Sequence, residues 1–172
     1  MHLSAEKLAR LDKYLYKLLK KNVDIMPMRF VKIIANYYTD ARIRKLYLLR
    51  LGVVMGEGTF TNLGFRIVSD DFKKRLFIGK NVSIAPNVTF ICMSSANNGN
   101  EINDIAYVKE VLTKSGNIMV DDEVWIGANV TVFPGVHIGR CSIIGAGSVV
   151  TKDIDEYSIY AGVPAKKIRS LK

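Results

Sequence analysis

An aliphatic residue recurs at every sixth position through most of the second half of the chain. The series is Val120, Ile126, Val132, Ile138, Ile144 and Val150, and four residues after each comes a small or branched side chain: Val124, Val130, Val136, Ser142, Ser148 and Ile154. A helix, with 3.6 residues per turn, would scatter a period of six around its surface. Short strands of a solenoid with three faces per turn would instead stack these side chains inward. The pattern therefore predicts an all-β solenoid.

Glycine directly follows three of these aliphatic residues, as Gly127, Gly139 and Gly145. We place these glycines at the corners of the solenoid, where the backbone bends and where glycine permits a positive φ.

The same register begins upstream and is interrupted once. Ile78 and Ile84 open two further units, Phe90 starts a third, and residues 55–67 read as degenerate early repeats. Phe90 and Val120 are separated by a multiple of six, but the residues between them lose the pattern. The sequence predicts an excursion over residues 93–117, and a loop of this length in a compact domain favours a functional role.

Three helices are predicted before the repeats. Leucines at helical spacing among lysines indicate the first, which Ser4 would cap. Pro27 suits the first turn of the second, Asp40 the N-cap of the third, and Gly52 its C-terminal stop. Because a solenoid end exposes unpaired apolar residues, we expect these helices to cover it. The predicted division is a helical segment 1–51, a coil 52–165 and a basic tail 166–172.

The 172 residues carry a net charge of +9, much of it in the first fifty residues and at the C-terminal end, whereas the repeats are nearly balanced. Aromatic and basic residues do not alternate as in nucleic-acid-binding strands, so no nucleic-acid partner is expected. A small polyanion, or weak contact between the basic N-terminal helix and an anionic membrane, explains the charge as well. Packing of that helix on its own solenoid or trimer is the simpler alternative.

The two cysteines, Cys92 and Cys141, lie in or beside repeat units and have no metal-ligand spacing. We expect reduced core or corner residues in a cytoplasmic protein, and no metal site. The sequence has no apparent signal peptide and no apolar run near the ~20 residues of a membrane span.

Four segments resemble the hexapeptide-repeat acyltransferases, in particular the galactoside, maltose and surface-polysaccharide acetyltransferases. They are residues 124–130 (VWIGANV), 134–136 (PGV), 143–154 (IIGAGSVVTKDI) and 161–165 (AGVPA). The resemblance implies a left-handed parallel β-helix, a homotrimer with sites between subunits, and acetyl-CoA as donor substrate. The left hand comes from the resemblance alone, because ordinary crossover connections favour the right.

The resemblance also assigns the donor site. The positions that match the groove for the pantetheine arm are Trp125, Ala128, Ala146, Thr151 and Lys152. Lys166 and Arg169 match basic positions that reach the coenzyme phosphates. One of these two positions is more usually arginine, and a lysine there replaces the two-pronged guanidinium with a point charge.

On the acceptor side, the resemblance points to Asn62, to the Asp70–Asp71 corner and, in the long loop, to Asn97. By composition alone, two carboxylates beside three cations are more typical of a solvated corner than of an acid–base pair.

The catalytic base is where this chain departs from the family. The family histidine that takes the proton from the acceptor hydroxyl corresponds to Ser95, which is at best a hydrogen-bonding orienter. The chain has two histidines, His2 at the N-terminus and His137 at an outward position of a repeat. Three alternatives follow from the missing histidine. Another residue serves as the base, the acceptor is an amine that loses its proton readily, or the rate of transfer is reduced.

The leading interpretation is an acetyl-CoA-dependent O-acetyltransferase that modifies a sugar hydroxyl, in surface polysaccharide biosynthesis. The alternatives are a sugar N-acetyltransferase and a non-catalytic trimeric scaffold, the latter because the histidine is absent. A zinc enzyme on the same solenoid would need several converging histidines, which this sequence does not supply.

Overall fold

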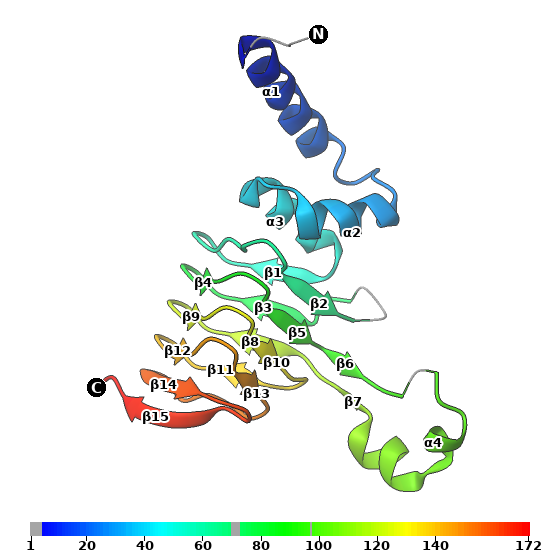
Figure 1. Ribbon diagram of the computed structural model, residues 1–172, viewed down its shortest axis with the longest axis vertical. Coiled ribbons are helices and arrows are strands. Elements are labelled where there is room, and N and C mark those ends of the chain that lie inside the picture. Colours follow the sequence, from blue (N-terminus) through cyan, green and yellow to red (C-terminus); the bar gives the residue numbers. More distant parts are fainter. Residues whose placement is uncertain (1–4, 70–72, 97) are drawn as a thin grey trace.

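The computed structural model describes residues 5–69, 73–96 and 98–172, and its centre is a coil with three parallel sheets as faces (Figure 1). Face A contains β1 (Val53–Met55), β3 (Leu76–Ile78), β8 (Ile118–Val120) and β11 (His137–Ile138). Face B contains β4 (Ser83–Ile84), β9 (Trp125–Ile126), β12 (Ile143–Ile144) and β14 (Ser158–Ala161). Face C contains β2 (Arg66–Val68), β5 (Thr89–Ile91), β10 (Thr131–Val132) and β13 (Val149–Val150). The chain passes from A to B to C in each coil, so strands that pair are one coil apart.

The predicted inward positions form the core of this coil. All six aliphatic residues of the hexad series are buried, with relative exposures of 3% or less. The six residues that follow them by four positions are buried as well, with relative exposures of 4% or less. The early repeats belong to the same core: Thr59 is buried, and its Oγ1 donates to Gly79 O at 2.7 Å and accepts from Val82 N at 2.9 Å. A buried hydroxyl needs such partners, so Thr59 can replace an aliphatic residue in the first coil.

The glycines of the repeat serve a different purpose from the one expected. Gly127 and Gly139 do not have positive φ; a Cβ on Gly127 would lie 2.6 Å from Ala146 N, and one on Gly139 would lie 2.6 Å from Glu156 N. These glycines permit close approach of the next coil. The left-handed corner conformation belongs to other residues, among them Asn81 (φ 54°) and Asn129 (φ 58°), because asparagine tolerates this region better than most residues.

The excursion leaves the coil between faces C and A and projects away from it (Figure 1). Its base is the antiparallel pair β6 (Met93–Ser94) and β7 (Lys114–Ser115). Beyond this pair lie α4 (Glu101–Asp104) and a π-helical turn, Val108–Leu112.

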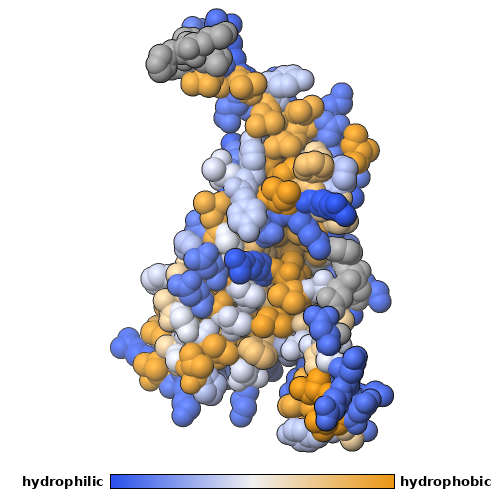
Figure 2. All heavy atoms as spheres, turned by 45° about the vertical axis from the view of Figure 1, so that its right-hand side comes forward, coloured by the Kyte–Doolittle hydropathy of each residue, from blue (hydrophilic) through white to orange (hydrophobic). Residues whose placement is uncertain are grey.

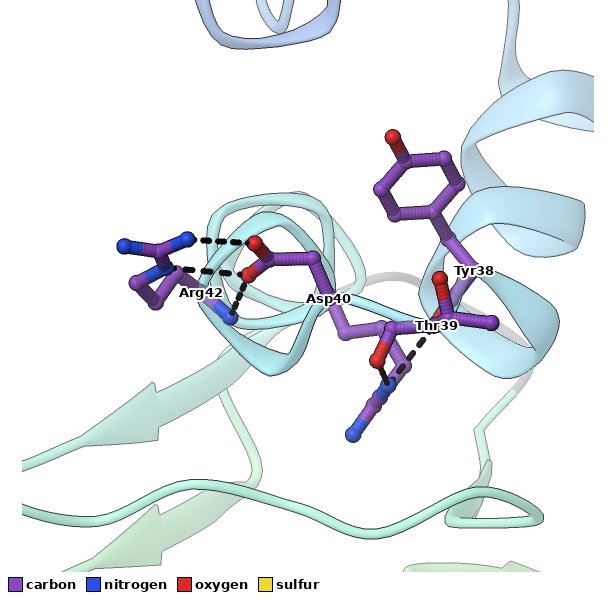
Figure 3. Close-up of polar contacts among 5 residues, drawn as sticks. Tyr38, Thr39, Asp40 and Arg42 are labelled. Carbon is purple, nitrogen blue, oxygen red and sulfur yellow. Dashed lines mark hydrogen bonds and ion pairs between the residues drawn. The ribbon is translucent and has the colours of Figure 1, made fainter. Parts of the chain in front are cut away.

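Three helices, α1 (Ala5–Lys21), α2 (Met28–Tyr37) and α3 (Ala41–Arg50), precede the coil, and α2 and α3 lie over its first turn (Figure 1). Pro27 is the residue before α2 and not within its first turn, Gly52 follows α3 with φ 83°, and Ser4 lies outside the described residues. Figure 3 shows Asp40 at the N-terminus of α3, where its Oδ1 accepts from Arg42 N at 2.8 Å.

Arg44 joins the helices to the coil. Its side chain is buried, and its guanidinium donates to the carbonyls of Tyr38, Thr39 and Thr61. Because Thr61 lies in the first coil, these bonds fix α3 against the start of the solenoid.

Candidate functional site

A hollow of about 400 Å³ lies on face B, between the first coil and the third. Its lining includes Phe60, Asn62, Ser83, Pro86 and Trp125. Phe60 bridges to Ser83, and Ser83 pairs with Trp125, so these three residues occupy one outward column on three successive coils. The parallel register thus gathers two exposed aromatic rings that are 65 residues apart in the sequence.

Asn62 supplies a fixed polar group in this hollow. Its Nδ2 donates to Ile84 O at 3.1 Å, which holds the amide against the coil. Lys45 lies beside the aromatic edge of the hollow, with its Nζ 5.2 Å from the centre of the Phe60 ring and bound to the carbonyls of Gly56 and Thr59. Partial burial lowers the pKa of Lys45. The hollow therefore combines apolar ring faces with an amide and a nearby cation.

A second hollow, of about 290 Å³, lies where the excursion leaves the coil. Its walls are Ser94, Leu112, Lys114, Phe133, Pro134 and Thr151. Ser95 directly follows Ser94 and is exposed, and Lys152 is exposed beside Thr151. The structure thus brings the predicted donor residue Thr151 and the position of the missing histidine to the same corner, between faces C and A.

The corner between faces B and C carries the two predicted alanines. Ala146 is exposed, Ala128 is half-buried, and Gly147 N donates to Ala128 O at 2.8 Å. Gly147 has φ 71°, and a Cβ there would meet no atom within 4 Å. The backbone at this corner is therefore uncovered, as an extended ligand chain requires.

Residues 166–170, expected as part of a tail, form a strand, β15 (Lys166–Ser170), paired antiparallel with β14. Lys166 and Arg169 are exposed on it and lie opposite Ala161 and Ile159. Lys167 differs from them because its Nζ binds Asp155 Oδ2 at 2.8 Å, an ion pair that raises the pKa of Lys167 and lowers that of Asp155. Two exposed cations thus stand on a fixed strand at the C-terminal end of the coil.

The other predicted residues are distributed as follows. Asp70, Asp71 and Asn97 lie outside the described residues. His137 points outward on face A, as expected, and its Nε2 lies 3.0 Å from Asp121 Oδ1. Cys92 is buried with its Sγ 3.9 Å from Arg75 O, Cys141 is a half-buried corner residue, and neither forms a disulfide.

Among the wall residues that sequence reasoning missed are Phe60, Ser83, Phe133 and Pro134. The hexad register could have found Phe60 and Ser83, because both share the outward column of Trp125. Phe133 and Pro134 gain their role from the excursion packed beside them, whose path no repeat predicts.

Comparison with known proteins agrees with the repeat pattern. Residues 117–152 match the family model described as bacterial transferase hexapeptide, six repeats. A galactoside O-acetyltransferase of Escherichia coli (strain K12) is 39% identical over 122 residues, which are 68% of this chain and 53% of that protein. The chain thus spans about half the length of this curated relative.

Two solved structures extend the likeness to the fold. A galactoside acetyltransferase in complex with coenzyme A superposes with a TM-score of 0.62 at 26% identity, covering 90% of this chain and 82% of that one. The polySia-specific acetyltransferase NeuO superposes with a TM-score of 0.54 at 34% identity. The match covers 69% of this chain and 52% of that one. With its buried hexads, its parallel three-faced coil and these relatives, the chain belongs to the hexapeptide-repeat acyltransferase family.

Proposed function

We propose that this protein transfers an acetyl group from acetyl-CoA to a carbohydrate hydroxyl, in a trimer whose sites lie between neighbouring subunits. The observation that carries the proposal is the separation of the candidate residues in one chain. Asn62 and Trp125 lie on face B, whereas Thr151 and Ser94 lie at the corner between faces C and A. One subunit cannot close a site around both groups, but a neighbour in a ring can set its C–A corner beside face B. The family relation further favours a left-handed coil.

The donor fits the uncovered strip that runs from the B–C corner to β15. Backbone at Ala146 and Gly147 is accessible to an extended pantetheine arm, whose amides would meet backbone polar groups. Lys166 and Arg169 are exposed and suit the anionic phosphates of the coenzyme. The related galactoside acetyltransferase was solved with coenzyme A, which supports this choice of donor.

The acceptor fits the hollow on face B. A sugar has apolar C–H faces and polar edges, and the hollow offers the rings of Phe60 and Trp125 beside the amide of Asn62. Trp125, which the resemblance assigned to the donor groove, is therefore proposed here as an acceptor residue, because it shares the hollow with Asn62. The relatives named for galactoside and polysialic acid support a saccharide. We place the reaction in the cytoplasm, on a precursor of surface polysaccharide.

In the reaction, an acceptor oxygen attacks the thioester carbonyl carbon. A C–O bond forms, the C–S bond breaks, and the coenzyme leaves as its thiol with the proton that the hydroxyl loses. Ser95 orients the acceptor by a hydrogen bond, and positioning in a closed site supplies much of the acceleration. Loss of a general base costs about 10²- to 10⁴-fold, so a modest kcat is expected with a hydroxyl acceptor.

The missing histidine also favours a second candidate, transfer to a sugar amine. A neutral amine is a good nucleophile before it loses a proton, so it depends less on a base. A non-catalytic trimer is the third candidate, because the chain lacks the catalytic histidine of the family.

Two measurements test the proposal. Titration calorimetry with acetyl-CoA at low and moderate salt should give micromolar binding that weakens with salt. Chromatographic assay of free coenzyme A, with sugars and amino sugars as acceptors, should then separate hydroxyl from amine transfer. Absence of binding at either salt concentration would remove both transferase candidates and leave the scaffold.

The oligomeric state is measured separately. Light scattering after size-exclusion chromatography should give three times the chain mass of 19.2 kDa. A monomer with full transferase activity would contradict a site between subunits.

A further inference from the structure

Helix α1 exposes a continuous apolar stripe. Leu8, Leu11, Leu15 and Leu18 are three or four residues apart, so they share one face, and they are 38–58% exposed. Figure 1 shows α1 directed away from the coil, and Figure 2 shows apolar atoms gathered on the helical part of the molecule.

The C-terminal part of α1 holds the helix to the rest of the chain. Leu19 is buried, and Tyr47 Oη donates to Leu19 O at 2.9 Å. The Arg42 guanidinium carbon lies 5.0 Å from the centre of the Tyr16 ring. The stripe toward the N-terminus is therefore held in a fixed place by contacts that do not cover it.

The charge of the protein is concentrated on the same helices. Residues 1–51 contain twelve Lys and Arg against four Asp and Glu, which is +8 of the total +9, and residues 52–172 are almost neutral. On α1 itself, six basic residues face two acidic ones. Lys13, Lys17, Lys20 and Lys21 are exposed on the sides of the helix that point away from the apolar stripe.

Several arginines of this region have structural roles, and within α1 Arg10 pairs with Glu6 at 2.7 Å. Arg42 pairs with Asp40 at 2.7 Å, Arg44 is buried on carbonyl oxygens, and Arg50 donates to Val23 O and Met26 O. On α1, by contrast, Lys13, Lys17, Lys20 and Lys21 are exposed.

An apolar stripe on one side of α1, with lysines on the other sides, selects among occupants of this surface. A second copy of α1 would cover the leucines but bring six basic residues against six others, which is unfavourable. An anionic lipid surface complements both features, because acyl chains accept the leucines and headgroups attract the lysines.

We propose that α1 lies flat in the headgroup region of an anionic membrane and docks the protein there. With 17 residues, α1 is about 25 Å long, and no helix of the described residues is long and apolar enough to cross a bilayer. The leucines enter the acyl boundary while the lysines stay among the headgroups. This docking is independent of the transfer reaction.

Flotation of the whole protein with lipid vesicles tests the proposal. The protein should float with phosphatidylcholine vesicles that contain about a third phosphatidylglycerol, and stay in solution with pure phosphatidylcholine. Each cation near an anionic surface contributes about 1 kcal/mol, so K13Q/K17Q should weaken partitioning about 30-fold. High salt should release the wild type.

Two further variants make the test specific. L11Q/L15Q keeps the charge and the helix propensity but removes the apolar stripe, and it should also lose most binding. K80Q/R140Q removes two exposed cations from the coil and should bind like the wild type.

The outcomes against the proposal are distinct. Equal flotation of L11Q/L15Q and wild type, or equal binding to both kinds of vesicle, would overturn it. A fall in oligomer mass in L11Q/L15Q, with no change in vesicle binding, would assign α1 to an interface between copies. Because the substituted side chains are exposed, all variants should keep the wild-type circular dichroism and Tm.

Discussion

Asn62 and Trp125 line one hollow on face B, although they belong to the first and third coils. In the outward column of this face, Ser83 lies between Phe60 of the first coil, to which it bridges, and Trp125 of the third, with which it pairs. A small residue in the middle coil, between larger ones above and below, is what makes this part of the sheet concave.

We expect Trp125→Ala to raise the acceptor KM about tenfold, because it removes an exposed ring that contributes about 1–2 kcal/mol of stacking and burial. Asn62→Ala should lower kcat/KM by a similar factor, through loss of a hydrogen bond. Steady-state kinetics measure both effects. Ile143→Ala, on the same face but beyond the hollow, is the control. Unchanged kinetics in both site variants would place the acceptor elsewhere.

The double change K166A/R169A should raise the KM for acetyl-CoA more than it lowers kcat, because the exposed cations bind donor phosphates away from the reacting atoms. Lys167→Ala is a matched control on the same strand, since its Nζ is engaged by Asp155. A rise in KM of the same size in the control would indicate a general effect of charge or of the strand.

The excursion can be removed without disturbing its base. Replacing residues 96–113 by one glycine leaves Ser95 and that glycine as a two-residue turn between β6 and β7. If the excursion completes a neighbour's site, transfer should disappear while trimer mass and Tm stay near wild type. A shortened protein with full activity would show that the excursion has no part in the reaction.

Asp40 gives a prediction for pH. Its hydrogen bonds and ion pair with Arg42 lower its pKa to about 2, from an ordinary value of 3.8. A lowered folded-state pKa means that this stabilisation is complete above pH 4 and is lost as the pH falls toward 2. Asp40→Asn keeps an N-cap acceptor but loses the ion pair, so the stability difference from wild type should shrink across that window in urea melts. A difference that is the same at pH 5 and pH 2.5 would contradict this role.

The core of the coil could be predicted because a period of six determines which side chains point inward. In a three-faced solenoid, Ile126 and Ile144 must point inward whatever their neighbours are, and so must Thr59 once the register is extended. The helix ends at Asp40 and Gly52 were also predictable, since capping depends on local backbone chemistry.

Three other features depend on contacts between distant segments, which a single hexad does not encode. Gly139 is small because Glu156 of the following stretch passes its Cα closely, and not because of its own φ. The pairing that turns Lys166 and Arg169 into strand residues requires β14 to end the coil with a free edge. In the same way, the hollow beside Thr151 exists only with the excursion in place.

The C-terminal strand has a consequence for how copies of this protein can assemble. A solenoid of parallel strands has an open edge at each end, and such edges can pair with other copies into filaments. Helices cover the first end, and β15, which runs antiparallel, closes face B at the other. Three of the five residues of β15 are Lys or Arg, so two such edges brought together would repel one another. End-to-end stacking of copies is therefore disfavoured, and we expect copies to associate through the sides of the coil.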